Sequence, residues 1–401
     1  EAQDQLLTTH LLFRKPSSAM EIAGGFHREW PDARGVFTNV AKEVVVWVNS
    51  TDHMRLMATR VGPDIQSAFL RFCELHAALE LAVKAQHLDF LKTDRYGYIS
   101  ANPREIGTSL RATVLVRLPK LSQIPEFHEL VGNLHLECFA DTIPGPLPAG
   151  QFVIGNSDRL RTDLQLVNCL IDGVDKLIQM EQALERGSKI NNQLFAIRNA
   201  HDNENIYPKT PPFPEHKCPD TIPDLIDHHN LLARALRAHP AAYHRYKAMT
   251  TQSGVPFARC LKTGVDVKGM PGTRMCGLVA GDEECYSLFR EVFDPVIEMR
   301  HGFPRGAKHT TDLDAESVRS VELDPDGRYI YSVQLRTSRN IRGYRLPPAC
   351  DQKQRRKVES IVVKALLGAG EDHHDDEKDG FEADPGLVGK YFPLLGSTSY
   401  P

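Results

Sequence analysis

A short apolar run constrains the fold of this chain more than any other stretch. Residues Val44-Val-Val-Trp-Val48 are followed at once by the polar segment Asn49-Ser-Thr-Asp-His-Met-Arg55. Four valines and a tryptophan in succession are typical of a strand that is covered on both faces. Polar groups directly after such a strand need hydrogen-bond partners if they stay buried. We therefore expect a buried strand that delivers a polar tip, ending on Arg55, to the place where any chemistry occurs.

Helices and strands alternate through the first part of the chain. Apolar residues recur at spacings of three and four from Ile65 to Ala85 and again from Asp163 to Arg186, which predicts two amphipathic helices. A strand is predicted at 112–118, and Arg111 stands directly before it. These elements favour a mixed helix and sheet domain with arginines at the strand ends.

The second part of the chain has a different character. Prolines crowd the segment from Ser188 to Pro223, which is typical of a linker, and a helical, strand-poor block follows from Leu225 to about Arg300. A strand is then predicted at 328–335, and Arg336 follows its end. At 401 residues the chain has room for two domains with a substantial core.

Bulk composition excludes several functions. Lys and Arg (48) nearly balance Asp and Glu (52), so charge calls for neither a nucleic-acid partner nor an anionic membrane. No apolar run is long enough to cross a bilayer, and the first residues lack the layout of a signal peptide. The eight cysteines show no zinc-type spacing, and we expect reduced thiols, no metal site and a cytoplasmic protein.

The chain resembles the phosphagen kinases, and creatine kinase most closely. The resemblance is carried by short motifs spread over nearly the whole chain outside the linker: Trp30-Pro-Asp-Ala-Arg-Gly35, Val46-Trp-Val-Asn49, Asp52-His-Met-Arg55, Gly107-Thr-Ser-Leu-Arg111, Val279-Ala-Gly-Asp-Glu-Glu-Cys-Tyr286, Phe293-Asp-Pro-Val296, Arg336-Thr-Ser-Arg-Asn-Ile-Arg-Gly-Tyr344 and Gly389-Lys-Tyr-Phe-Pro-Leu394. Their order is rotated, because the family's helical block comes first and here it follows the segments that match residues 1–190. The rotation indicates either a circularly permuted domain or a slice of a tandem array, as in the flagellar forms; a single compact unit is the preferred interpretation.

The resemblance implies an α+β fold: a small all-α domain beside a larger domain with an antiparallel sheet flanked by helices, as in creatine and arginine kinases and the catalytic domain of glutamine synthetase. On this chain the larger domain would combine residues 1–190 with 318–401. The small domain would span 219–305, with a linker at 191–218 and a connector at 306–317.

Moving a phosphoryl group between ATP and a guanidinium nitrogen requires cations around the phosphates and a nucleophile held in line. No Gly-rich P-loop motif is present, so side chains would have to hold the phosphates, and arginines suit that task because their planar forks bind phosphate oxygens in pairs. The resemblance assigns phosphate contacts to Arg55, Arg111 and Arg336 and a nucleotide contact to His10. The nucleotide would be Mg-ATP or Mg-ADP, if nucleotide binding is retained.

Other positions depart from the family pattern. Thr51 stands where the resemblance calls for the glutamate that orients the guanidinium, and Asn102 stands where it calls for the reactive cysteine. Gln334 stands where the family has a further phosphate arginine. The family's arginine at the start of the mobile flap falls at about the position of Cys138. Losing one oriented catalytic contact typically costs about 10²–10³ in rate. No catalytic residue is therefore intact, and we expect a phosphagen-kinase fold without guanidino kinase activity.

This pattern favours a pseudokinase with a structural or assembly role, as in a flagellar axoneme, whose partners are other proteins or sister kinase domains. Two alternatives remain open. The chain is an active ATP:guanidino phosphotransferase if a neighbour such as Asp52 supplies the missing carboxylate, or it acts on another substrate such as protein arginine. Taken singly, each of the three arginines fits a surface ion pair better than a phosphate contact, but three of them at strand ends, each inside a family motif, favour the phosphate contact. His10 fits a structural role as well as a nucleotide contact.

Overall fold

The structure is a computed structural model that describes residues 15–139, 147–188, 212–271, 274–304, 306–368 and 387–397. The predicted nucleotide contact His10 and most of the predicted linker lie outside these residues. Within them, no helix has both the length and the apolarity needed to cross a membrane.

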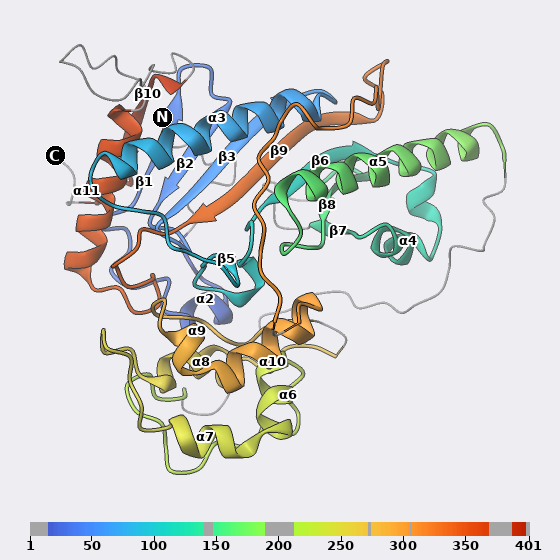
Figure 1. Cartoon of the computed structure of the whole chain (residues 1–401). Helices are drawn as coiled ribbons and strands as arrows, with labels where there is room; N and C mark the ends of the chain where they lie inside the picture. Colours follow the sequence, from blue (N-terminus) through green and yellow to red (C-terminus); the bar gives the residue numbers. More distant parts are fainter. Residues whose placement is uncertain are drawn as a thin grey trace.

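One eight-stranded antiparallel sheet organises the larger part of the molecule (Figure 1). The predicted strand at Val44–Val48 is confirmed as β2, with four of its five side chains buried. The strands follow one another across the sheet in the order β10 (Gly389–Pro393), β1 (Gly35–Asn39), β2 (Val44–Val48), β3 (Met54–Val61), β9 (Ile330–Arg339), β6 (Arg111–Arg117), β8 (Gln151–Asn156) and β7 (Leu136–Phe139). Strand β9 lies between β3 and β6, so segments far apart in the sequence complete one sheet.

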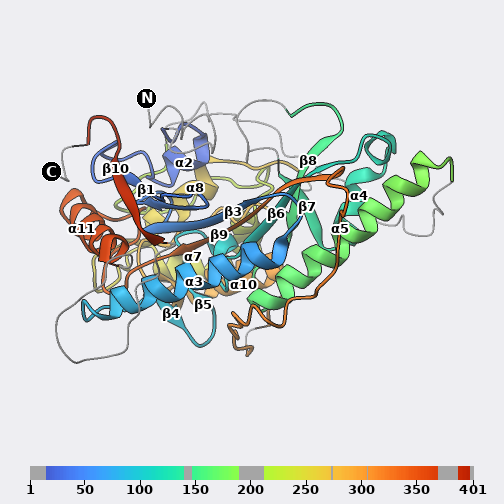
Figure 2. The same cartoon turned by 90° about the horizontal axis from the view of Figure 1, so that it is seen from above.

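Three long helices cover one face of this sheet, and Figure 2 shows α3 and α5 running along it. They are α3 (Ile65–Lys84), α5 (Asp163–Glu185) and α11 (Gln352–Gly368). Both predicted helices of the first part are thus confirmed to within one residue at each end. Asp64 caps α3, and a Thr162–Gln165 capping box starts α5, which satisfies backbone N–H groups that a helix start leaves free. Helix α4 (Phe127–Asn133) adds to the same layer beside β7.

A separate helical unit lies below the sheet in Figure 1. Its own hydrophobic core includes Phe257, Phe289 and Phe293. Residues 212–271 and 274–304 hold no strand, which agrees with the strand-poor block that the sequence predicts. The helices of the unit are α6 (Leu231–Ala238), α7 (Pro240–Tyr246), α8 (Phe257–Asp266), α9 (Cys285–Leu288) and α10 (Arg290–His301), and α2 (Ala19–Ala23) packs on α8. The α+β fold class is confirmed.

One strand boundary was predicted wrongly. The strand predicted at 328–335 is β9, which begins at Ile330 and continues to Arg339, so Arg336 lies inside the strand and not after it. Pairing of residues 337–339 with β3 extends the strand beyond its predicted end, and an isolated sequence pattern does not show such a partner. Because successive residues of a strand project to opposite faces of a sheet, the place of Arg336 within β9 determines the face to which its side chain projects.

Candidate functional site

The three predicted phosphate arginines lie on one face of the sheet. Arg111 stands directly opposite Arg336 in the β6–β9 ladder, and Arg336 stands opposite Met57 in β3. Arg55 precedes Met57 by two residues, and alternate residues of a strand project to the same side. The neighbouring Val114 and Val333 project to the other side, into the core under the long helices. The structure therefore brings Arg55, Arg111 and Arg336 to the face that those helices do not cover, which we call the arginine face.

Arg55 is held by the residue that replaces the family's glutamate. Its Nη2 donates a hydrogen bond of 2.7 Å to Oγ1 of Thr51, and its guanidinium lies over the ring of Trp47, 5.1 Å from the centroid. Trp47 is the exact cross-strand neighbour of Arg55, which explains the stacking. Thr51 thus contacts the arginine but contributes no negative charge to the site.

Arg111 belongs to a group of alternating charges that we call the Glu105 cluster: Arg104, Glu105, Arg111, Glu137 and Arg159. Glu105 accepts a hydrogen bond of 3.1 Å from Arg111 and one of 3.4 Å from Arg159. Arg104 donates to Glu137 at 3.0 Å, and Arg159 lies 3.7 Å from the same Glu137 oxygen. Glu137 stands opposite Gly155, and Gly155 stands opposite Thr113, which lies two residues after Arg111 in β6. Glu137 therefore projects to the arginine face, as Arg111 does. Two carboxylates of the protein therefore form ion pairs with three guanidinium groups.

The charges of this cluster shift its pKa values. Burial alone would raise the pKa of Glu105, but the guanidinium groups of Arg111, Arg159, Arg104 and Arg336 hold it well below its usual value. Burial lowers the pKa of Arg159 to about 10, while Glu105 works in the opposite direction. At neutral pH, Glu105 is an anion and Arg159 a cation, so their pairing is fully ionic.

Sequence reasoning missed Glu105 and Arg159. Glu105 sits six residues before Arg111 in a loop that the sequence already marks by its arginine, and Arg159 follows the end of β8. Both are charged residues beside strand ends, the same signal that singled out Arg111. Their pairing joins positions 54 residues apart and depends on the β6–β8 ladder.

Asn102 has a structural role at the position of the family's cysteine. It caps the short 3-10 helix Pro103–Glu105, where its Oδ1 accepts the backbone N–H of Arg104 at 3.0 Å. The loop beyond this turn is fixed against Arg159, because Thr108 donates its backbone N–H to the Arg159 carbonyl at 3.0 Å. Gly107 has φ +92°, and a Cβ there would meet the same carbonyl oxygen at 2.4 Å.

The other departures from the family pattern do not share one location. Gln334 lies on the arginine face, two residues before Arg336, and its Nε2 is 3.5 Å from Oγ1 of Thr59. Cys138 stands opposite Ile154 and packs into the core under the helices, where burial raises its pKa to about 12. Cys138 is therefore not brought together with the arginines, whereas its neighbour Glu137 is.

Asp52 is engaged elsewhere. Its carboxylate, 2% exposed, accepts hydrogen bonds from Oγ of Ser100 at 2.9 Å, from the backbone N–H of Ala101 at 2.9 Å and from Nδ2 of Asn340 at 2.7 Å. Asn340 also accepts the backbone N–H of His53 at 2.8 Å. We call these five residues the Asp52 network. These hydrogen bonds join Asp52 to scaffold groups and not to Arg55, Arg111 or Arg336.

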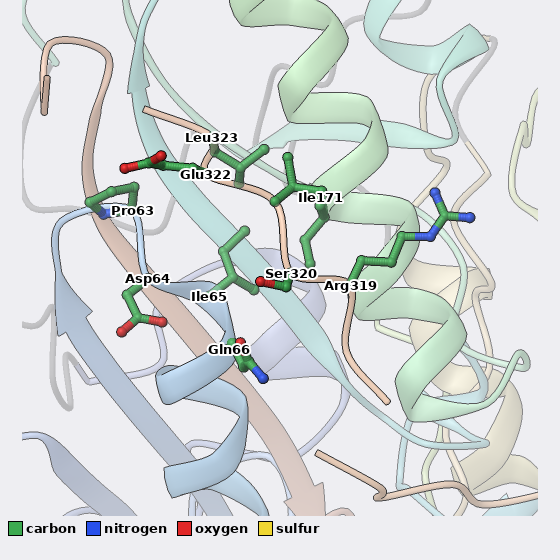
Figure 3. Close-up of a pocket in the computed structure, with 10 residues that line it drawn as sticks. Pro63, Asp64, Ile65, Gln66, Ile171, Arg319, Ser320, Glu322 and Leu323 are labelled. Carbon is green, nitrogen blue, oxygen red and sulfur yellow. The ribbon is translucent and has the colours of Figure 1, made fainter. Parts of the chain in front are cut away.

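Among the described residues, no group of three or more His, Cys, Asp or Glu side chains is placed to hold a metal ion. A small pocket lies elsewhere, between the start of α3, α5 and the segment at 319–323 (Figure 3). Its lining includes Ile65, Ile171 and Leu323, while the guanidinium of Arg319 points outward and bonds Asp172. Pro63 and Asp64 of this pocket follow the last residue of β3, so the pocket is at the opposite end of that strand from Arg55.

Comparison with known proteins identifies the class of this fold and site. The C-terminal catalytic domain of ATP:guanido phosphotransferases matches residues 1–184, and the N-terminal domain of the same family matches residues 226–298. The catalytic domain thus precedes the N-terminal domain, which agrees with the rotated order of the sequence motifs. The chain belongs to the ATP:guanido phosphotransferase family, the phosphagen kinases.

Individual relatives align with nearly the whole chain. A flagellar creatine kinase of Strongylocentrotus purpuratus is 36% identical over 404 residues, which cover 99% of this chain and 32% of that protein. An arginine kinase of Anthopleura japonica is 31% identical, with 99% of this chain and 49% of that protein covered. This chain therefore spans about a third of the length of the first relative and about half of the length of the second.

Two solved structures are similar to parts of the chain. A crystal structure of lombricine kinase matches with a TM-score of 0.46 and 36% identity over 48% of this chain and 54% of that one. The duplicated taurocyamine kinase of Schistosoma mansoni, with bound transition state analog components, matches with a TM-score of 0.41 and 25% identity over 76% of this chain and 39% of that one.

Proposed function

We propose that this chain is a phosphagen-kinase module that has lost guanidino phosphotransfer and serves as a structural or assembly unit. One observation carries the proposal: groups of the protein itself hold Arg55 and Arg111, two of the three predicted phosphate arginines. Glu105 bonds Arg111 and Arg159, and Thr51 bonds Arg55. Phosphoryl transfer depends almost wholly on positioning and on charge around the phosphates. An arginine pair already neutralised by a carboxylate stabilises little additional negative charge.

Neither Thr51 nor Asp52 offers a free carboxylate to a guanidinium substrate, which supports the same proposal. Thr51 is neutral, and Asp52 is buried among Ser100, Ala101 and Asn340. Releasing Asp52 to bind a cation would leave these donors unsatisfied, at about 1–3 kcal/mol each. Asp52 therefore does not replace the lost glutamate, which removes the main support for an active enzyme that uses a neighbouring acid.

The setting of such a module follows from its relatives. A flagellar creatine kinase aligns over 99% of this chain within a third of its own length, and the catalytic and N-terminal domain matches occur in rotated order. We propose that the chain corresponds to one period of a tandem array in a flagellar or other cytoplasmic assembly, with sister kinase domains or other proteins as partners. Its sheet domain would comprise 1–190 and 318–401, with 191–218 as linker, 219–305 as helical domain and 306–317 as connector.

An active ATP:guanidino phosphotransferase is the alternative, and one observation favours it. Arg55, Arg111 and Arg336 still share one sheet face, and Nε of Arg111 is buried without a hydrogen-bond partner in the described part of the chain. Such a donor suits a phosphate oxygen of Mg-ATP or Mg-ADP. Nucleotide binding by itself is compatible with both an inactive module and an active enzyme, so turnover is the quantity that separates them.

A coupled assay of ADP formation tests the proposal directly. The chain is incubated with Mg-ATP and, in turn, creatine, arginine, taurocyamine, glycocyamine or an arginine-containing protein, and each rate is compared with that of the same mixture without chain. We expect no guanidino-dependent rate above background. Turnover of any one substrate at about 1 s⁻¹ or faster, the lower end of ordinary enzyme rates, would refute the proposal. Calorimetry with Mg-ADP then measures whether nucleotide binds at all.

A further inference from the structure

We propose that Glu105 is a built-in competitor for phosphate: its carboxylate occupies the guanidinium groups of Arg111 and Arg159 and thereby sets how tightly this face of the sheet binds a phosphate-bearing ligand. The inference rests on the proposed function only in taking the arginine face as the anion-binding face. It identifies Glu105 as the determinant of anion affinity, a role distinct from the lost catalytic groups.

Geometry places Glu105 where an anion would sit. Its two oxygens are divided between two guanidinium groups: Oε1 bonds Nη2 of Arg111 at 3.1 Å, and Oε2 bonds Nε of Arg159 at 3.4 Å. Oε1 also lies 3.9 Å from Nε of Arg104. A carboxylate shared in this way uses the donors that a phosphate group would use. Carboxylate and phosphate cannot both occupy them.

The carboxylate is held rigidly in this position. Asn102 caps the turn that carries Glu105, and Pro103 restricts its backbone. On the other side of Glu105, Gly107 exchanges two backbone hydrogen bonds with Tyr98, of 2.8 and 3.2 Å. The pairing is therefore preorganised, and an incoming anion would have to displace a carboxylate whose backbone does not move away with it.

The competitor remains charged at physiological pH. Burial would raise the pKa of Glu105, but four surrounding arginines hold it well below its usual value, so protonation does not release Arg111 or Arg159 near neutrality. Donors for a ligand nevertheless remain, because Nε of Arg111 and Nη2 of Arg159 are buried without hydrogen-bond partners among the described residues. Removing the carboxylate charge should therefore convert a weak anion site into a strong one.

The test compares anion affinity in the whole chain and in Glu105→Gln. The amide keeps the size of the side chain and one oxygen acceptor but removes the charge. Isothermal calorimetry with inorganic pyrophosphate and, separately, with Mg-ADP should show affinity rising at least about tenfold in E105Q, because a carboxylate next to the bound anion repels it. Glu43→Gln is the matched control, since it removes one carboxylate that pairs with Arg60 away from the cluster; its affinity should equal that of the unchanged chain.

Equal affinities of E105Q and the unchanged chain, including no detectable binding by either, would overturn the inference. If E105Q does not fold, Glu105→Asp takes its place: the shorter side chain keeps its charge but cannot reach both arginines, so affinity should rise by a smaller factor, and no rise would overturn the inference. The double variant E105Q/R111Q should lose the gain. The ratio of the anion affinities of E105Q and the unchanged chain is measured without turnover. Phosphotransfer by the unchanged chain would therefore refute the proposed function, while this ratio would still test the role of Glu105.

Discussion

The Asp52 network and the Glu105 cluster show how surroundings determine the role of a carboxylate. Asp52 is buried and bonded by neutral donors from Ser100, Ala101 and Asn340. Glu105 is less buried and bonded by the guanidinium groups of Arg111 and Arg159. Neutral donors stabilise a carboxylate as a structural link between segments. Positive partners make a carboxylate a competitor for any anion that needs the same cations.

The pKa values of the two carboxylates shift in opposite directions, although burial acts to raise both. Burial raises the pKa of Asp52, against the hydrogen bonds from Asn340, Ala101 and Ser100. Burial also acts to raise the pKa of Glu105, but the arginines around it prevail and lower that pKa. Changes to Asp52 should therefore alter folding without altering anion binding, whereas changes to Glu105 should alter both.

Removing the Asp52 carboxylate should have the largest effect. Asp52→Ala leaves the buried donors of Ser100, Ala101 and Asn340 without an acceptor, and we expect a loss of about 4 kcal/mol in the free energy of unfolding. Urea denaturation measures this loss. Asp52→Asn is the matched control, because its amide retains one acceptor oxygen and can donate to Ser100, and it should lose only about 1 kcal/mol. A loss in D52A no larger than in D52N would contradict a structural role for the carboxylate.

Acid should weaken the same region through His53. Burial lowers the pKa of His53 to about 4, so between pH 6.5 and 4 the unfolded chain binds a proton that the folded chain does not. The contribution of His53 to stability must therefore fall as pH falls through this window, by about 2 kcal/mol at pH 5. Urea denaturation at pH 7 and pH 5 measures the loss.

His53→Gln is the matched variant, since glutamine can donate to the Arg345 carbonyl and accept from the N–H of Ile341 as the ring does. Its loss between pH 7 and pH 5 should be smaller than that of the unchanged chain by about 2 kcal/mol. Equal losses would show that His53 is not the titrating group. His301 and His309, whose pKa values burial also lowers to about 4, should produce the same direction of change in both proteins.

Removing the Glu105 charge should have a smaller effect on stability than removing Asp52. We expect Glu105→Gln to lose about 1–2 kcal/mol without ligand, because Arg111 and Arg159 keep one oxygen partner but lose its charge. Saturating pyrophosphate should restore this stability, since a ligand that binds only the folded state stabilises it. Thermal unfolding with and without pyrophosphate measures both quantities. A destabilised E105Q that pyrophosphate does not stabilise would argue against competition at this site.

Introducing a carboxylate at position 51 should have the smallest effect. Thr51→Glu places a negative charge beside Arg55, in a half-buried position, and should change the free energy of unfolding by less than about 1 kcal/mol. We expect no guanidino-dependent ADP formation, because Glu105 still holds Arg111 and Arg159. Thr51→Gln serves as the neutral control for size. Turnover by T51E alone would show that the cluster does not limit the activity.

Much of the fold could be predicted from sequence. The valine run predicted β2, and the apolar spacing predicted α3 and α5, because burial of a strand or of one helix face leaves a local periodic pattern. The end of β9 could not be predicted in the same way. Its last residues are extended by pairing with β3, and the pattern of a single strand does not contain its neighbours.

The candidate site, like the fold, could be predicted from the sequence only in part. The sequence alone singled out Arg55, Arg111 and Arg336 and showed that Thr51 and Asn102 replace the residues that the family resemblance expects. Only the tertiary structure decided that Asp52 belongs to the scaffold and that Glu105 faces two arginines. The partners of Asp52 are 48 and 288 residues away, and Arg159 is 54 residues from Glu105. A carboxylate has the same chemistry in every sequence, and its role depends on the donors that folding brings to it.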